Sequence, residues 1–360
     1  MSRIKILKKV DAVLGTVGAA LLPSARERQH GEISRILVIR PGGIGDAVLL
    51  IPALNALKRR YPGAEITVLA ERRNAAAFSL APAVASVILY DDPSQLAQAV
   101  RGNYDLVIDS EQWHRLSGVI ARLAGAPVSI GFATNNRRRL FAHRIPYSHD
   151  RYEAESFFDL LAPLGIEPPP SLETPFLTIP EDAAARAEAF VPAGRPLLAI
   201  FPGASIPERR WGMERFRRVA DHLSLRGLSI VVVGGEEDAE EGAYIVKWCG
   251  GTNLAGKTTL AETAAVIARS LLLVSGDSGV LHLAVGLGIP TVSLFGPGIE
   301  EKWGPQGEFD LILNKRLTCS PCTRFGTTPS CPEKARCLTD IAPNEVVDAV
   351  MKVLDRRYPE

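Results

Sequence analysis

An acidic residue, Asp46, follows a glycine-rich loop in the sequence RPGGIGD, directly after an apolar run at residues 36–39. A long amphipathic helical pattern comes next, and a second apolar run occupies residues 66–69. This order predicts a strand–helix–strand unit, and ligands of open α/β sheets bind at the carboxyl ends of the strands. A carboxylate in that place can act as a general base, or it can cap the helix.

The glycines of this loop, Gly42, Gly43 and Gly45, would let a ligand approach the backbone closely. Free N–H groups at a helix start favour anionic or oxygen-rich ligands. The loop does not read G-x-G-x-x-G, and no G-K-[S/T] follows it, so neither a dinucleotide fingerprint nor a P-loop is present. This argues against an NAD-dependent oxidoreductase.

A second polar turn, GDSG at residues 276–279, follows an apolar run and opens a helical pattern that carries His282. Successive backbone N–H groups at a helix start form an anion nest, which suits a diphosphate. The carboxylate of Asp277 suits a sugar hydroxyl, or it caps the helix. His282 lies one turn further on, where it either reaches a phosphate or leaving group or serves a structural role.

Two arginines, Arg209 and Arg210, stand beside Trp211, shortly after the loop PGAS at residues 202–205. Arginine is suited to paired contacts with phosphate oxygens. These side chains are therefore candidates for binding phosphate, and a surface position for each charge is the alternative.

Four of the five cysteines are concentrated in one irregular segment rich in Pro, Gly and Thr. Their spacing is C-x2-C-x8-C-x5-C, formed by Cys319, Cys322, Cys331 and Cys337. Four thiols at this density fit a small zinc or iron–sulfur site. Disulfides, which need an oxidising compartment, and packed reduced thiols are the alternatives.

The composition of the whole chain indicates which kind of protein positions these residues. The chain has 360 residues, of which 46% are hydrophobic and 22% charged, and its net charge is +1. A chain of this length typically forms two domains. The nearly neutral charge and the lack of zinc-finger, RRM and KH signatures argue against a nucleic-acid partner. No apolar stretch reaches the roughly 18 residues that a membrane-spanning helix needs.

A proline-rich stretch, GIEPPPSLETP, separates two halves that each alternate apolar runs with helical patterns. Successive prolines cannot continue a helix or join a central strand. We therefore expect a first α/β domain at residues 35–170, a linker region at 171–194 and a second α/β domain at 195–360. The expected strands are residues 36–39, 66–69, 87–90, 106–109, 197–201, 229–233, 271–275 and 291–295, and the expected helices after the first include 94–100, 116–123, 213–225 and 260–270.

Residues 1–34 precede the first of these domains and have an amphipathic pattern. Apolar residues at helical spacing follow a basic start, with Ile6, Val10, Val13, Val17 and Leu21 on one side and Arg3, Lys5, Lys8 and Lys9 at the beginning. This pattern predicts a helix lying on an anionic membrane surface. A helix packed on the protein itself and a cleaved signal peptide are the alternatives.

A basic stretch at residues 135–144 also allows two interpretations. Its charges are Arg137, Arg138, Arg139, His143 and Arg144. The stretch is either a solvated face or an electropositive rim that holds an anionic substrate.

Four blocks in order resemble glycosyltransferase family 9, the ADP-heptose:lipopolysaccharide heptosyltransferases. They are RPGGIGDAVLLIPAL, FPGASIPERRWGMERF, LAGKTTLAETAAVIARS and SGDSGVLHLAVGLGIPTVSLFGP. The resemblance implies a GT-B fold, in which two Rossmann-like domains face each other across a cleft. It further implies an acceptor site in the first domain, a nucleotide-sugar site in the second, and inversion at the anomeric carbon without an essential metal.

The resemblance also implies roles for individual residues. Asp46 matches the proposed general base of the family, and the D-[ST]-G-x-x-H turn that contacts the donor matches Asp277, Ser278, Gly279 and His282. Ser205 matches the small hydroxyl residue of the PGAS loop, and Arg209 stands where Lys is common. The acid after the GG turn is Glu236 or Glu237, of which we retain Glu237.

The implied function is transfer of a heptose from ADP-heptose to a lipopolysaccharide inner-core acceptor. A cytoplasmic location with peripheral contact to the inner membrane follows from those substrates. The alternatives are a related transferase with another nucleotide sugar or surface-glycan acceptor, and a nucleotide-sugar epimerase, since one fold can serve several reactions. Only a transferase requires a second sugar as acceptor.

Overall fold

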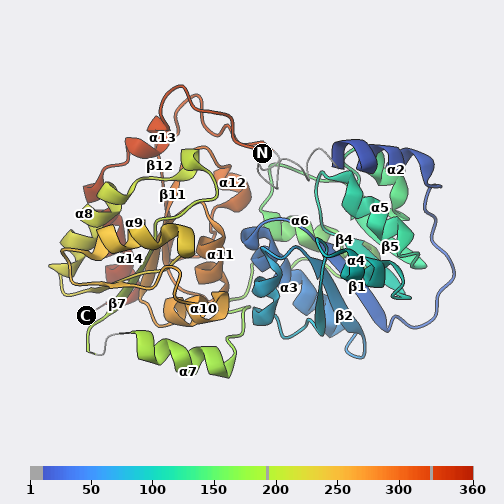
Figure 1. The fold of residues 1–360 in the computed structure, drawn as a ribbon, viewed down its shortest axis with the longest axis horizontal. Helices are drawn as coiled ribbons and strands as arrows, with labels where there is room; N and C mark the ends of the chain where they lie inside the picture. Colours follow the sequence, from blue (N-terminus) through green and yellow to red (C-terminus); the bar gives the residue numbers. More distant parts are fainter. Residues whose placement is uncertain (1–10, 192–193, 325–326, 360) are drawn as a thin grey trace. The chain divides into compact units, whose positions relative to one another are not determined.

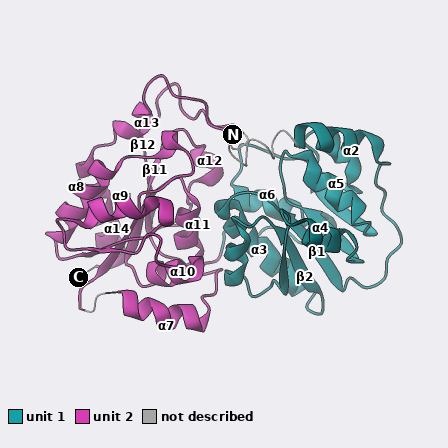
Figure 2. Cartoon of the chain, viewed as in Figure 1, with its two compact units in different colours: residues 1–172 teal, residues 173–360 magenta. Residues whose placement is uncertain are grey.

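The computed structural model describes residues 11–191, 194–324 and 327–359. The chain divides into two compact units, Met1–Leu172 and Glu173–Glu360 (Figures 1 and 2). Each unit is a parallel β-sheet with helices packed against it. The predicted α/β class is therefore confirmed.

The first unit contains six parallel strands in the order β3-β2-β1-β4-β5-β6. The strands are β1 (Arg35–Arg40), β2 (Glu65–Ala70), β3 (Ser86–Leu89), β4 (Leu106–Asp109), β5 (Val128–Phe132) and β6 (His143–Ile145). The α-helices that follow them are α3 (Ile44–Arg60), α4 (Pro93–Val100), α5 (Arg115–Leu123) and α6 (Glu153–Asp159), with 3-10 turns at Ala75–Leu80, Asn136–Leu140 and Ala162–Leu164. The central strands are runs of buried apolar residues, as expected for a parallel sheet covered on both faces.

The second unit repeats this architecture with the strand order β12-β11-β10-β7-β8-β9. Its strands are β7 (Leu197–Phe201), β8 (Ser229–Val232), β9 (Thr252–Asn253), β10 (Leu272–Gly276), β11 (Thr291–Phe295) and β12 (Asp310–Asn314). Its helices are α7 (Glu181–Phe190), α8 (Met213–Ser224), α9 (Ala239–Val246), α10 (Leu260–Ala268), α11 (Gly279–Gly286), α12 (Glu300–Trp303), α13 (Arg336–Thr339) and α14 (Pro343–Arg357), with 3-10 turns at Pro207–Arg209 and Glu236–Asp238. Helices α8 and α14 pack together over the sheet and close its core.

Each sheet has one topological switch point, where successive connections leave in opposite directions. In the first sheet it lies between β1 and β4, and in the second between β7 and β10. Ligands of doubly wound sheets bind in the crevice outside the carboxyl ends of the strands at such a point. The loops after these four strands are therefore where the fold itself favours a site.

Helix α7 lies within residues 171–194, where the proline-rich stretch suggested a linker. It belongs to the second unit and packs against α10. Its buried face is formed by small residues, Ala183 and Ala187.

The described part of the N-terminal segment comprises a single π-helical turn, η1 (Asp11–Gly15), and helix α2 (Thr16–Leu21). The carboxylate of Asp11 accepts the N–H of Leu116 at 2.7 Å, which anchors the segment to the first turn of α5. Ala19 is fully buried and packs with Val119 and Leu140. The side of the segment that carries Asp11 and Ala19 therefore packs on the first unit. This agrees with the alternative of a helix packed on the protein itself.

The opposite side of this segment carries apolar side chains that are open to solvent. The exposed fractions are 62% for Val13, 59% for Leu14, 49% for Val17 and 80% for Leu21. Ile6, Val10 and the basic residues before them lie outside the described residues. Within the described part of the chain, no helix is both long and apolar enough to cross a membrane.

Candidate functional site

Asp46 lies in the first turn of α3, three residues after the helix N-cap. The N-cap is Gly43, which has no side chain to cap the helix. Asp46 is therefore not the N-cap residue of α3. The carboxylate is half-buried beside the glycine loop. Gly42 has φ of +114°, a conformation that side chains rarely adopt, so the loop needs glycine there.

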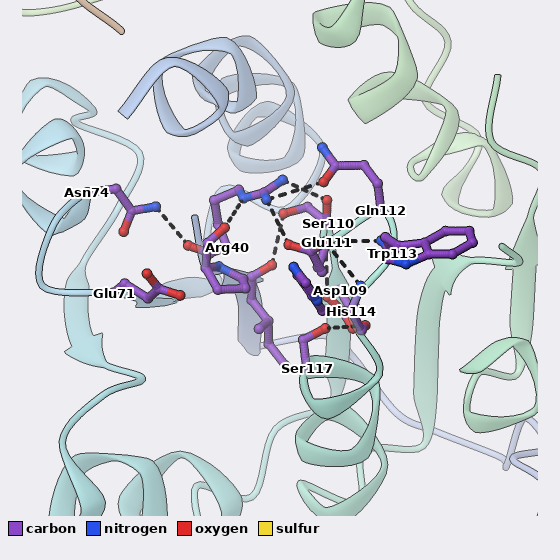
Figure 3. A network of polar contacts seen from close by, with 12 residues as sticks. Arg40, Glu71, Asn74, Asp109, Ser110, Glu111, Gln112, Trp113, His114 and Ser117 are labelled. Carbon is purple, nitrogen blue, oxygen red and sulfur yellow. Dashed lines mark hydrogen bonds and ion pairs between the residues drawn. The ribbon is translucent and has the colours of Figure 1, made fainter. Parts of the chain in front are cut away.

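A buried arginine, Arg40, connects the loops at the carboxyl ends of three strands (Figure 3). Its Nε donates to the carbonyl of Pro41 at 2.8 Å, and its Nη1 donates to the carbonyl of Ser110 at 2.8 Å. Its Nη2 lies 3.1 Å from a carboxylate oxygen of Glu111. The backbone carbonyl of Arg40 accepts the side-chain amide of Asn74 at 3.0 Å. One residue thus joins the loops that follow β1, β2 and β4.

The charge of Arg40 also acts on the acids around it. Burial alone would lower the pKa of Arg40, but the negative charges of Asp46 and Glu111 raise it overall. Burial would likewise raise the pKa of Glu111, and the charge of Arg40 brings it below its usual value. The guanidinium therefore remains charged within electrostatic range of Asp46.

Tyr147 and Glu153 add a second polar group near Asp46. The phenol of Tyr147 donates to Glu153 at 3.0 Å, and the amide of Gln112 donates to the other oxygen of the same carboxylate. Burial raises the pKa of Tyr147, and the charges of Glu153 and Asp46 raise it further. Tyr147 therefore stays a neutral hydrogen-bond donor at physiological pH.

Arg137 is not part of an electropositive rim, which corrects one interpretation of the basic stretch. Its side chain is fully buried, forms an ion pair with Asp109, and donates to the carbonyl of Glu111. The neighbouring Arg138 and Arg139 do line an open hollow of about 460 Å³, together with residues 133–136. Arg138 and Arg139, unlike Arg137, therefore face a space that an anion could enter.

In the second unit, Arg209 and Asp277 meet at the switch point of the sheet. Arg209 ends the turn Pro207–Arg209 after β7, and Asp277 directly follows β10. The Nη1 of Arg209 lies 2.9 Å from the carboxylate of Asp277, and its Nη2 donates to the hydroxyl of Thr323 at 3.3 Å. Among the described residues, the buried Nε of Arg209 has no hydrogen-bond partner. An N–H in that state fits an oxygen of a bound ligand.

Ser278 and Gly279 form the start of α11. The hydroxyl of Ser278 caps the helix by accepting the N–H of Leu281 at 3.2 Å, and it lies 2.9 Å from the hydroxyl of Ser275. Gly279 is the first helical residue. The turn predicted to form an anion nest is thus the start of a helix. Arg209 contacts Asp277, the residue before the N-cap Ser278.

His282 is almost fully buried in α11, with 3% of its surface exposed. Burial lowers the pKa of His282 to about 4, although the charge of Asp277 acts in the opposite direction. The imidazole is therefore neutral at pH 7. It can offer one hydrogen bond to a ligand but no positive charge.

Ser205 and Glu237 are both exposed in the loops that follow β7 and β8. The sequence missed the buried acid of the same turn, Asp238, which accepts the N–H of Gly235 at 3.1 Å. Arg210 pairs with Asp238 at 3.1 Å and with Glu241 at 2.8 Å. Arg210 is therefore held by protein acids and is not the free phosphate ligand that its position suggested.

The four clustered cysteines are not joined by disulfides in the structure, and they line one cavity of about 160 Å³ in the second unit. Within the described ranges, no three His, Cys, Asp or Glu side chains already stand at metal-binding distances from one another. Cys249 lies elsewhere, and its thiol makes a weak contact at 3.6 Å with the carbonyl of Val246.

A family model described as glycosyltransferase family 9 (heptosyltransferase) matches residues 94–331, which is well over half of the chain. The chain belongs to glycosyltransferase family 9. The lipopolysaccharide heptosyltransferase 2 of Salmonella typhimurium is 26% identical over 349 residues, which cover 89% of this chain and 98% of that protein.

Two solved structures show the same fold. E. coli ADP-heptose LPS heptosyltransferase II has a TM-score of 0.74 at 23% identity, with 90% of this chain and 99% of that chain covered. E. coli heptosyltransferase WaaC with ADP-2-deoxy-2-fluoro heptose has a TM-score of 0.67 at 19% identity, with 88% and 99% covered. The two six-stranded parallel sheets are thus the GT-B-like fold that the family 9 resemblance implies.

Proposed function

We propose that this family 9 protein transfers a heptose from ADP-heptose to a lipopolysaccharide inner-core acceptor, with inversion and without a metal ion in the chemical step. One observation carries the proposal. The switch point of the first sheet holds a carboxylate near a buried guanidinium, and that of the second holds an arginine–aspartate pair at a helix start. Acid–base chemistry and diphosphate binding are what these two groups of residues can supply. The names of two relatives support these substrates, since one is a lipopolysaccharide heptosyltransferase and the other an ADP-heptose LPS heptosyltransferase.

In the proposed reaction Asp46 takes the proton from the attacking acceptor hydroxyl as that oxygen bonds to the anomeric carbon. The bond between that carbon and the diphosphate breaks on the opposite face. The exposed backbone at Gly43, together with Gly42 and Gly45, would allow the acceptor sugar to come close to the loop.

The diphosphate gains negative charge as it leaves, and Arg209 with the helix start at Ser278 and Gly279 would stabilise that charge. The neutral His282 would donate a hydrogen bond to the donor, and Asp277 would hold Arg209 in place while accepting a sugar hydroxyl. Ser205 and Glu237, both exposed at the same sheet edge, would contact the donor nucleoside. Any metal held by the cysteines then has a structural role only.

Replacing Arg209 by Met should weaken ADP binding and lower kcat by about 10²- to 10³-fold, the usual effect of removing one preorganised donor to a developing charge. Arg209→Lys should recover only part of this loss, because an ammonium keeps the charge but not the paired geometry. Arg269→Met is the control, since Arg269 makes one 3.5 Å surface pair with Glu188. Calorimetric titration with ADP and steady-state kinetics test the prediction. Equal ADP affinity in both Met variants would remove Arg209 from the donor site.

The donor itself is tested by calorimetric titration with ADP, UDP and GDP and by turnover with the matching nucleotide sugars. The proposal predicts tight binding of ADP alone and turnover of ADP-heptose alone. Preferred binding of UDP or GDP would leave the family assignment intact and contradict the proposed substrate. Turnover without any acceptor, giving an isomerised nucleotide sugar, would indicate the epimerase class.

We further propose that the exposed apolar side of the N-terminal segment contacts an anionic membrane surface. Two arginines contact the C-terminal end of this segment, since Arg139 donates to the carbonyl of Ala20 at 3.2 Å and Arg122 donates to the carbonyl of Pro23 at 3.1 Å. Apolar side chains beside guanidinium groups are the composition that interfacial helices show. A lipid-anchored acceptor would be met at that surface.

The combined variant Val13→Ser, Val17→Ser and Leu21→Ser should reduce binding to phosphatidylglycerol-containing vesicles by about tenfold or more, because apolar burial is lost. Activity on membrane-embedded acceptor should fall, and activity on a soluble acceptor fragment should not. Leu225→Ser is the control, with a side chain 87% exposed in the second unit. Equal loss of activity on both acceptors would show that the segment only stabilises the domain.

A further inference from the structure

Four cysteines within residues 319–337 line one small cavity of the second unit. The cavity has a volume of about 160 Å³, and the rest of its lining consists largely of proline and other small residues. Cys337 is buried, Cys322 and Cys331 are half-buried, and Cys319 is exposed. Four thiols converge here without forming a disulfide.

All four sulfur-bearing side chains contribute to the wall of the same cavity, although they come from positions up to 18 residues apart in the sequence. Thiolates that face one small space repel one another unless a cation lies between them.

One of these sulfurs already accepts a hydrogen bond from the backbone. The N–H of Ala335 donates to the Sγ of Cys331 at 3.3 Å. The backbone turns back toward this sulfur through Lys334 and Ala335, whose φ angles are 50° and 55°. Such left-handed conformations cost free energy in residues other than glycine and cluster at functional sites. The turn is thus shaped around the sulfur.

We propose that Cys319, Cys322, Cys331 and Cys337 bind one metal ion through four thiolate sulfurs, as a closed structural site of the zinc or iron type. Four sulfur ligands in a tetrahedron are typical of structural zinc, and the same ligand set suits iron. Because the thiols do not yet stand at coordinating distances from one another, the ion would draw them together and displace their protons.

The site would act on the donor pocket through Thr323, which is the part of the inference that rests on the proposed function. The N–H groups of Cys322 and Thr323 both donate to the carbonyl of Pro297, at 3.1 and 2.9 Å. Thr323 is 1% exposed, and its hydroxyl accepts a hydrogen bond of 3.3 Å from the guanidinium of Arg209. Fixing Cys322 on a metal therefore fixes the residue that orients Arg209.

Elemental analysis of the purified full-length protein tests the metal site directly. We expect about one zinc or iron per chain in the wild type and in Cys249→Ser, and loss of that metal in Cys322→Ser and Cys331→Ser. The identity of the element decides between zinc and iron. A folded wild type without metal, in which all the clustered thiols react at once with a thiol reagent, would overturn the site. A denatured, unreduced protein with one free thiol instead of five would overturn it too, since it would show disulfides.

Should the cysteine variants fail to fold, removal of the metal from folded wild type with a chelator replaces them. The expected result is simultaneous exposure of four thiols and a loss of ADP affinity of about tenfold, the effect of one hydrogen bond to a charged group.

Thr323→Val should weaken ADP binding similarly and keep the metal. Unchanged ADP affinity in both cases would overturn the link to Arg209. A metal-loaded protein that binds no ADP at all would contradict the proposed function and leave the metal site standing.

Discussion

Asp46→Asn should lower kcat by about 10²- to 10⁴-fold, the range expected when a general base is removed. Asparagine has nearly the same shape as aspartate but cannot accept a proton at neutral pH. The first turn of α3 should be preserved, because its N-cap is Gly43, which the substitution leaves in place. Donor affinity should stay unchanged, since the donor is assigned to the second unit.

The control for this variant is Asp92→Asn, another acid at a helix start of the same unit. Asp92 caps α4 by accepting the N–H groups of Ser94 and Gln95 at 3.0 and 3.1 Å. Asparagine is an equally good cap, so kcat and stability should match the wild type. If Asp46→Asn is as active as Asp92→Asn, the base must be another residue.

Arg137→Met should lower the free energy of unfolding by about 3–5 kcal/mol, because it leaves a buried carboxylate without its partner. Arg137 and Asp109 are both fully buried and form an ion pair. Burial raises the pKa of Asp109 even with Arg137 beside it, so the carboxylate depends strongly on that charge. Urea unfolding of the purified variant measures the loss.

Two further variants separate the charge from the packing. The double variant Arg137→Met with Asp109→Asn should regain most of the stability, because no charge remains unpaired and the amide oxygen can still accept the N–H of Glu111. Arg138→Met removes an exposed neighbouring charge and should stay within about 0.5 kcal/mol of the wild type. An Arg137→Met midpoint equal to that of Arg138→Met would contradict the importance of the buried pair.

Most of the central strands could be predicted from the sequence almost residue by residue, whereas β5, although fully buried, was missed. β4, β7 and β11 have the bounds that their apolar runs predict, because strands buried on both faces are continuous apolar sequences. The edge strands β6, β9 and β12 were not predicted. They are short or only half-buried, so polar residues interrupt the apolar signal.

The residues of the candidate site could be proposed from the sequence only where local sequence carries the information. A glycine loop before a helix and an acid at a strand end are local patterns, and they located Asp46 and Asp277. The roles of Arg40 and Arg137 depend on partners far away in the chain, with Arg40 and Glu111 separated by 71 residues. A charge alone does not reveal whether it will be buried, so the sequence suggested a surface for Arg137 and passed over Arg40.

The most direct test of the proposed function is incubation of the full-length chain with ADP-heptose and an inner-core acceptor, followed by mass and NMR analysis of the product. We predict an acceptor that is heavier by one heptose, linked with the anomeric configuration opposite to that of the donor, and release of ADP only when acceptor is present. An unmodified acceptor with ADP-heptose, together with transfer from a UDP- or GDP-sugar, would contradict the account.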